Sequence, residues 1–179
     1  VAAAGVAIYL VGWLIIVVPF VPVVVAHPPN TYASASISAA LLWLLGSLAA
    51  YATVLLTGPF QTDRISLLTV WFLAGFAAQL LFGVMSHLLP TMMGGGPVTA
   101  AGLAEMNRWW LWRVLVINGG LLLWLLPLDS WVKVALSSLV MLAFILFLPI
   151  MIRSARAAIC PAPSTIASLA AEAPMSMPQ

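Results

Sequence analysis

Charged residues are nearly missing from this sequence. Its 179 residues include 6 lysines and arginines and 4 aspartates and glutamates, so 6% of the chain is charged, whereas an average soluble domain carries about a quarter. So little polar surface cannot coat a particle that is soluble in water. The composition therefore excludes a soluble globular fold, and the scattered basic residues exclude a nucleic-acid-binding stripe.

Cysteine and the common catalytic motifs are scarce as well. The single cysteine, Cys160, cannot form an internal disulfide, and the residues around it lack the spacing of metal ligands. The sequence has no CxxC or HExxH motif and no Ser, His and Asp set for nucleophilic catalysis. The glycines at 94–96 are not followed by the Lys and Ser or Thr of a phosphate-binding loop. No soluble enzyme class is therefore indicated.

Long apolar runs are what the sequence has in abundance. Hydrophobic residues make up 64% of it, and its mean hydropathy is +1.17. A spanning helix needs about 20 mostly apolar residues, and lipid offers the backbone no hydrogen-bond partner, so the spans must be helical. We predict an all-α integral membrane bundle of about five transmembrane helices. The predicted spans are about 2–26, 33–57, 66–89, 109–126 and 131–152.

The two ends of the chain lead to further expectations. The transmembrane domain takes up residues 1–152, and the Ala-, Ser- and Pro-rich residues 153–179 are predicted to be a linker or disordered tail. The first span begins directly at Val1 without the charged flank of an export signal, so we expect a fragment of a longer chain. Pro19 and Pro22 remove amide donors within the first span and predict a kink there.

Alternation of the spans predicts which connections share a side of the membrane. The turn at His27, the glycine loop after Pro90 and the C-terminal tail fall on one side. That side carries Arg108, Arg113, Arg153 and Arg156, and the opposite side carries Arg64 and Lys133. Because positive charge is enriched on the cytoplasmic side, we predict that the first side is cytoplasmic. We expect a multi-pass protein of a cell membrane, of the bacterial inner-membrane type.

The two histidines are the most informative candidates for a cofactor site. Parity places His27 and His87 on the same side and at the same depth, and imidazole is the commonest metal and haem ligand. The alternative is that His27 is a hydrated loop residue and that His87 bonds a neighbouring helix. Met92 and Met93 follow His87, and thioether with imidazole suits copper, although methionine is also a common apolar filler. We take His87, Met92 and Met93 as candidate metal ligands.

An arginine lies within the fourth predicted span. Arg113 is about one turn inside the membrane and follows Trp109, Trp110 and Trp112. If its head snorkels to the surface, the tryptophans are simply an interfacial belt. If it does not, Arg113 and Arg108 neutralise an anion, and haem propionates would be the natural anion beside two histidines. We therefore take His87, His27, Arg113 and Arg108 as candidate cofactor-binding residues.

The third span has a face of small and polar residues. Gly75, Gln79 and Gly83 follow one another at i+4 steps. Such a face packs against other helices, because small residues allow close approach. Gln79 needs a polar partner in a medium without water, and either a cofactor or a buried polar cluster would supply one.

One stretch resembles a known group of membrane proteins. It reads LLFGVMSHLLPTMMGGGP and then AEMNRWWLWRVLVINGG, and it covers roughly residues 82–120, about a fifth of the chain. It resembles part of the catalytic subunit of haem-copper oxidases and nitric oxide reductases. It is still more similar to the membrane domain of actinobacterial multicopper oxidase or copper nitrite reductase-like proteins, a group similar to NnrS. This implies a helical module that holds haem or copper and partners a cupredoxin-type domain.

The resemblance has a clear departure. The haem-copper families take metal ligands from several histidines on helices, whereas this chain has two histidines. His87 stands where those relatives commonly show Tyr or Asn. No family ligand can therefore be carried over to a matching position of this chain.

Three classes of function follow from the sequence. The leading hypothesis is a membrane module of a haem- or copper-associated respiratory-type oxidoreductase, which supports electron transfer to a copper domain. The second is a carrier or channel for a metal ion or small anion, with His87, Gln79 and Arg113 along the path. The third is a structural membrane anchor. The expected partners are the lipid bilayer and a cupredoxin-type copper domain or other redox partner, with a homo-oligomer as an open alternative.

Overall fold

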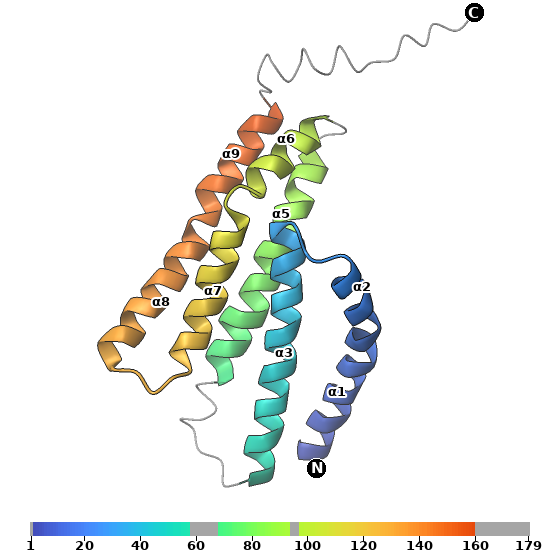
Figure 1. The fold of residues 1–179 in the computed structure, drawn as a ribbon, viewed down its shortest axis with the longest axis vertical. Coiled ribbons are helices and arrows are strands. Elements are labelled where there is room, and N and C mark those ends of the chain that lie inside the picture. Colours follow the sequence, from blue (N-terminus) through green and yellow to red (C-terminus); the bar gives the residue numbers. More distant parts are fainter. Residues whose placement is uncertain (1, 58–67, 94–96, 160–179) are drawn as a thin grey trace, which may run out of the picture.

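Helices account for all regular structure in the residues that the structure describes. The structure is a computed structural model, and it describes residues 2–57, 68–93 and 97–159. Four helices are long and apolar enough to cross a membrane: Ala4–Ala26, Tyr32–Thr57, Leu68–Met93 and Ser130–Ala157. A shorter apolar helix, Trp110–Trp124, lies among them. The predicted all-α membrane bundle is therefore confirmed (Figure 1).

The first span stands at the edge of the bundle. It consists of α1 (Ala2–Val17), a 3₁₀ segment, η1 (Val18–Phe20), and α2 (Val21–Ala26), and its main contacts with the other spans are to α3 (Figure 1). Pro19 lies in the 3₁₀ segment, where the α-helical hydrogen bonds stop. The predicted irregularity is thus confirmed near the prolines.

The second span, α3 (Tyr32–Thr57), is capped at its start by its own sequence. The Ser34 amide donates to Thr31 Oγ1 over 3.2 Å, and the Thr31 amide donates to Ser34 Oγ over 3.3 Å. This reciprocal pair satisfies amides that the first turn of a helix leaves without partners. α3 then lies against the third span along a stripe of small side chains that includes Ala35, Ser36 and Ala40.

The third span approaches α3 closely. It begins with a π-helix, η2 (Trp71–Ala78), and continues as α5 (Gln79–Met93). A Cβ atom added at Gly75 would lie 2.6 Å from Trp43 Cγ, and one added at Gly83 would lie 3.0 Å from Ser36 Cβ. Both glycines and Gln79 are buried. The packing face predicted from their spacing is therefore confirmed.

The fourth span is a broken helix, which the sequence did not predict. α6 (Pro97–Met106) and α7 (Trp110–Trp124) are joined by a short turn that contains Trp109, whose φ is 56°. α6 packs on α9 and α7 packs on α8, and the two run in the same direction across the bundle (Figure 1). We expected residues 90–108 to connect the third and fourth spans, but Pro90 lies inside α5, which continues to Met93. α6 forms there because its sequence, PVTAAGLAEM, starts with proline and is rich in alanine.

The last span is α8 (Ser130–Ile145) followed by α9 (Phe147–Ile159). α9 extends into the region predicted as a tail, and residues 160–179, with Cys160, lie outside the described residues. The start of α3, the end of α5 and the end of α9 lie toward one end of the bundle (Figure 1), as the predicted alternation requires. Which end faces the cytoplasm stays a prediction, and Arg64 lies outside the described residues.

Candidate functional site

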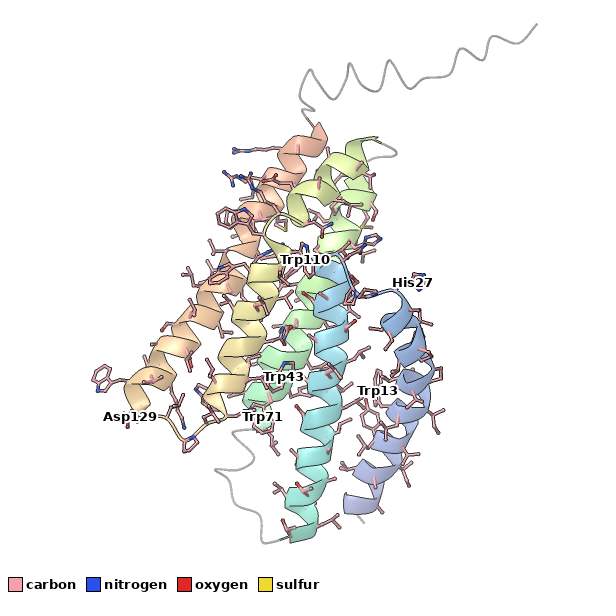
Figure 2. The ribbon with its side chains drawn as sticks, viewed as in Figure 1. Trp13, His27, Trp43, Trp71, Trp110 and Asp129 are labelled. Carbon is pink, nitrogen blue, oxygen red and sulfur yellow. The ribbon has the colours of Figure 1, made fainter. Side chains whose placement is uncertain are left out.

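Three helix ends meet where the fourth span is broken. The C-terminus of α6 ends at Met106, the N-terminus of α7 begins at Trp110, and the N-terminus of α3 begins at Tyr32. Tyr32, Met106 and Phe147 form a buried cluster there, against which Trp110 packs (Figure 2). Helix N-termini carry partial positive charge and free amide donors. The N-termini of α7 and α3 therefore meet the C-terminus of α6 at the break.

Asn107 connects the break to the second span. Its side-chain Oδ1 accepts a hydrogen bond of 2.9 Å from the Tyr32 amide, which belongs to the first turn of α3. A residue in the turn between two half-helices thus caps a third helix. This bond fixes the position of Tyr32 relative to the break.

Arg113 lies at the centre of this arrangement. It is 4% exposed, its Nη2 donates to the carbonyl oxygen of Met106, and its guanidinium carbon lies 3.8 Å from the centre of the Tyr32 ring. The Met106 carbonyl belongs to the last turn of α6, where the helix dipole favours a cation. Of the two interpretations offered by the sequence, snorkelling to the surface does not describe this buried side chain.

Much of the hydrogen-bonding capacity of Arg113 is unused. Nε and Nη1 are buried and have no hydrogen-bond partner among the described residues, and these two nitrogens carry three of the five N–H donors of a guanidinium. Within residues 2–57, 68–93 and 97–159, the ion pair present joins Glu105 to Arg108 at 3.6 Å, and no carboxylate pairs with Arg113. A buried charge without a counter-charge is costly. A ligand with oxygen acceptors and negative charge would satisfy these donors.

A second polar cluster lies deeper in the bundle. Asn118 Oδ1 accepts from Trp43 Nε1 at 2.8 Å and from Gln79 Nε2 at 3.2 Å. Asn118 Nδ2 donates to Gln79 Oε1 at 3.1 Å and to the Val114 carbonyl at 2.9 Å. These bonds join α3, α5 and α7, and Figure 2 marks Trp43 between these helices. Of the two partners proposed for Gln79 from the sequence, a polar cluster is the one present.

The histidine candidates are placed differently. His87 on α5 and His27 at the end of α2 are both exposed, and neither imidazole has a hydrogen bond within the part of the chain that the structure describes. Figure 2 shows His27 at the outer edge of the bundle. Met92 and Met93 are also exposed, at the end of α5. No group of three or more His, Cys, Asp or Glu side chains suited to a metal ion occurs among the described residues.

Arg108 is not brought to Arg113. It lies in the turn before α7, is exposed, and pairs with Glu105 one turn earlier in α6. Sequence reasoning also missed Tyr32 and Asn107, which contact or frame the Arg113 guanidinium. The sequence did indicate Asn107, because it is a polar residue between an alanine-rich segment and a tryptophan-rich segment. Tyr32 carried no signal, because its role depends on a contact across 81 residues of chain.

Comparisons with other proteins do not assign this site. No protein-family model, curated protein or solved structure matches the chain. The resemblance to membrane domains of copper-containing oxidoreductases therefore stays a prediction.

Proposed function

We propose that this chain is a membrane module that binds a small anion at Arg113, as part of a carrier or channel. The observation that carries the proposal is the buried Arg113 guanidinium, which has two nitrogens without partners and no carboxylate within the described residues. Proteins place an ionisable group inside a membrane at a high energetic cost, and such groups commonly mark ligand or ion pathways. An anion supplies both the missing charge and the missing acceptors.

The surroundings of Arg113 support an oxyanion in particular. The Tyr32 ring covers one face of the guanidinium, so a ligand is directed to the planar edge, where N–H donors lie side by side. Carboxylate-like oxyanions match this fork with two parallel hydrogen bonds. The bond from Nη2 to the Met106 carbonyl holds the guanidinium in place.

The broken fourth span supports passage as well as binding. Carriers commonly use discontinuous helices, whose N-termini point at anionic substrates. Here the N-terminus of α7 lies one turn before Arg113, and the N-terminus of α3 lies beside it at Tyr32. The amides at the start of α3 are already bonded to Thr31, Ser34 and Asn107, so the end of α7 is the one that favours negative charge beside Arg113.

The haem- or copper-associated module is the alternative proposal. Arg113 could then pair with a haem propionate, but His27, His87, Met92 and Met93 are all exposed on the described surface and do not enclose a cofactor. Ligands would have to be completed by another chain. An optical spectrum of the purified protein tests this alternative, because bound haem gives a Soret band, and elemental analysis tests for copper.

The test of anion binding uses the full chain in lipid nanodiscs and in proteoliposomes. Formate, nitrate and chloride are titrated while tryptophan fluorescence is recorded, and efflux of the bound anion is followed from liposomes. We expect Arg113→Gln to weaken binding by at least about 100-fold, as expected for a charge-assisted bidentate contact. Arg113→Lys should recover part of the affinity, because it restores the charge without the fork.

Arg108→Gln is the matched control. It removes an exposed arginine five residues away that already pairs with Glu105, and binding should stay unchanged. Equal affinity in wild type and Arg113→Gln would overturn the proposal. Binding without efflux would retain the anion site and exclude a carrier or channel role for this chain alone.

A further inference from the structure

A second basic surface lies outside the Arg113 site, on α9. Arg153 and Arg156 are exposed on this helix, whereas Phe147 and Ser154 are buried. Ser154 Oγ donates to the Gly102 carbonyl over 2.9 Å and so fixes this face of α9 against α6. At 3.6 residues per turn, Arg153 and Arg156 lie about 100° and about 160° around the helix from Ser154. Both therefore point away from the bundle.

The length of the last span places these arginines at a particular depth. The span Ser130–Ala157 has 28 residues and is thus about 42 Å long, whereas the hydrocarbon core is about 30 Å thick. Trp131, exposed at the start of this span, suits the interface on the opposite side. The last eight or so residues then extend beyond the hydrocarbon. Arg153 and Arg156 fall in this segment, at the level of lipid headgroups.

Exposed tryptophans at the same end support this depth. Trp109 is 73% exposed and Trp112 is 65% exposed, at the break between α6 and α7. Met106, which ends α6, packs with Ile150 and Met151 on α9, so the break lies about one turn below Arg153. Tryptophan prefers the boundary between hydrocarbon and headgroups. The two arginines thus lie just outside an aromatic belt.

Neither arginine has a partner of opposite charge. In the part of the chain that the structure describes, Arg153 and Arg156 make no ion pair, and Glu105 on the neighbouring helix is already used by Arg108. Within the described residues the pair therefore presents two positive charges without a partner of opposite charge, one turn apart on the helix. A lipid with a net negative headgroup complements this charge, whereas a zwitterionic headgroup brings its own cation.

We infer that Arg153 and Arg156, beside the belt of Trp109 and Trp112, form a binding site for the headgroup phosphate of an anionic phospholipid. The guanidinium groups bind the phosphate oxygens, and the exposed tryptophans lie against the glycerol and upper acyl region. This site does not rest on the proposed function at Arg113.

The test uses the full chain in bilayers that contain a brominated lipid, which quenches tryptophan fluorescence on contact. Brominated phosphatidylglycerol or brominated phosphatidylcholine is mixed into the bilayer in separate samples. The extent of quenching gives the association of each lipid with the protein relative to the bulk lipid. For the wild type we expect phosphatidylglycerol to be preferred several-fold, and the double variant Arg153→Gln with Arg156→Gln to reduce this preference to about one. Lys133→Gln, at the other end of the bundle, is the matched control and should retain the preference.

Three outcomes would overturn the inference. These are a wild-type preference of one, an unchanged preference in the double variant, and an equal loss in Lys133→Gln. Added glycerol phosphate separates the two sources of phosphate: it should not compete, and full competition would identify a soluble phosphate as the ligand instead. Arg113→Gln should leave the lipid preference unchanged, so failure of this inference and failure of the anion proposal are distinguishable.

Discussion

The two polar clusters inside the bundle differ in how fully their polar groups are hydrogen-bonded. In the cluster of Trp43, Gln79 and Asn118, the side-chain amides and the indole bond to one another, and the cluster joins three spans. In the cluster around Arg113, two of the three guanidinium nitrogens have no partner in the part of the chain that the structure describes. A membrane provides no water to satisfy buried groups. The satisfied cluster therefore functions in packing, and the unsatisfied one is the place to look for a ligand.

The largest expected effect comes from adding the anion itself. A ligand at about 100 times its Kd stabilises the folded state by about 2.7 kcal/mol. Thermal unfolding in nanodiscs should show this gain for the wild type and none for Arg113→Gln. An equal gain in both proteins would remove the distinction between the clusters, because the anion would then bind elsewhere.

Disrupting the cluster of Trp43, Gln79 and Asn118 should lower the stability of the protein and leave anion affinity nearly unchanged. Asn118→Leu leaves Gln79 and the Trp43 indole without their main partners, and we expect a loss of about 1.5 kcal/mol in stability. Anion affinity should change by less than about twofold, since Asn118 does not contact Arg113. Unfolding and fluorescence titration of the same sample measure both quantities. A large drop in anion affinity would instead show that the two clusters act as one binding site.

A smaller effect is expected from the glycine that lets Trp43 approach. The added Cβ of Gly75→Ala would lie 2.6 Å from Trp43 Cγ, so the indole must move, at a cost of about 1 kcal/mol. Gly119→Ala is the matched control, because nothing lies within 4 Å of the added atom. The control should be neutral or slightly stabilising. Equal stability of the two variants would argue that the indole does not need its present position.

The histidines should have the smallest effect on stability. His87→Ala and His27→Ala each remove an exposed imidazole without a described hydrogen bond, and each should change stability by less than about 0.5 kcal/mol. Optical spectra of the same variants serve a second purpose. Loss of a Soret band in His87→Ala, with the band kept in His27→Ala, would favour the haem alternative over the anion proposal.

Much of the fold could be predicted because membrane helices are long and apolar. Hydropathy located four long apolar helices and a shorter apolar one. The third span, however, was predicted to end at residue 89, before Pro90, whereas Pro90 lies inside α5, which continues to Met93. The i+4 spacing also identified the buried face of Gly75, Gln79 and Gly83. Such features depend on local sequence alone. The same reasoning failed between residues 90 and 108, where α6 is short and its partner, α9, is distant in sequence.

The exposure of His87 has a simple geometric cause. Within α5 each i+4 step turns about 40° around the helix, so the two steps from Gln79 to His87 add up to about 80°. Ser86, seven residues from Gln79, returns to within about 20° of it and is buried. The position of His87 along its helix could therefore be predicted by counting residues. The direction in which its imidazole points depends on the helical rotation that accumulates over those residues. In the same way, the sequence shows that Arg113 lies near the start of its helix. It does not show that the Met106 carbonyl accepts a hydrogen bond from the guanidinium.

The break in the fourth span also has an electrical consequence. Between the break and the far end, the span is α7 alone, and its 15 residues measure about 22 Å, less than the hydrocarbon thickness of about 30 Å. When an anion and its water enter the site at the break, the membrane voltage falls mainly across this shorter distance. An anion at Arg113 then crosses part of the field as it binds, at about 2.3 kcal/mol per charge for each 100 mV fully crossed. The fraction of sites occupied by an anion would thus depend on the membrane potential.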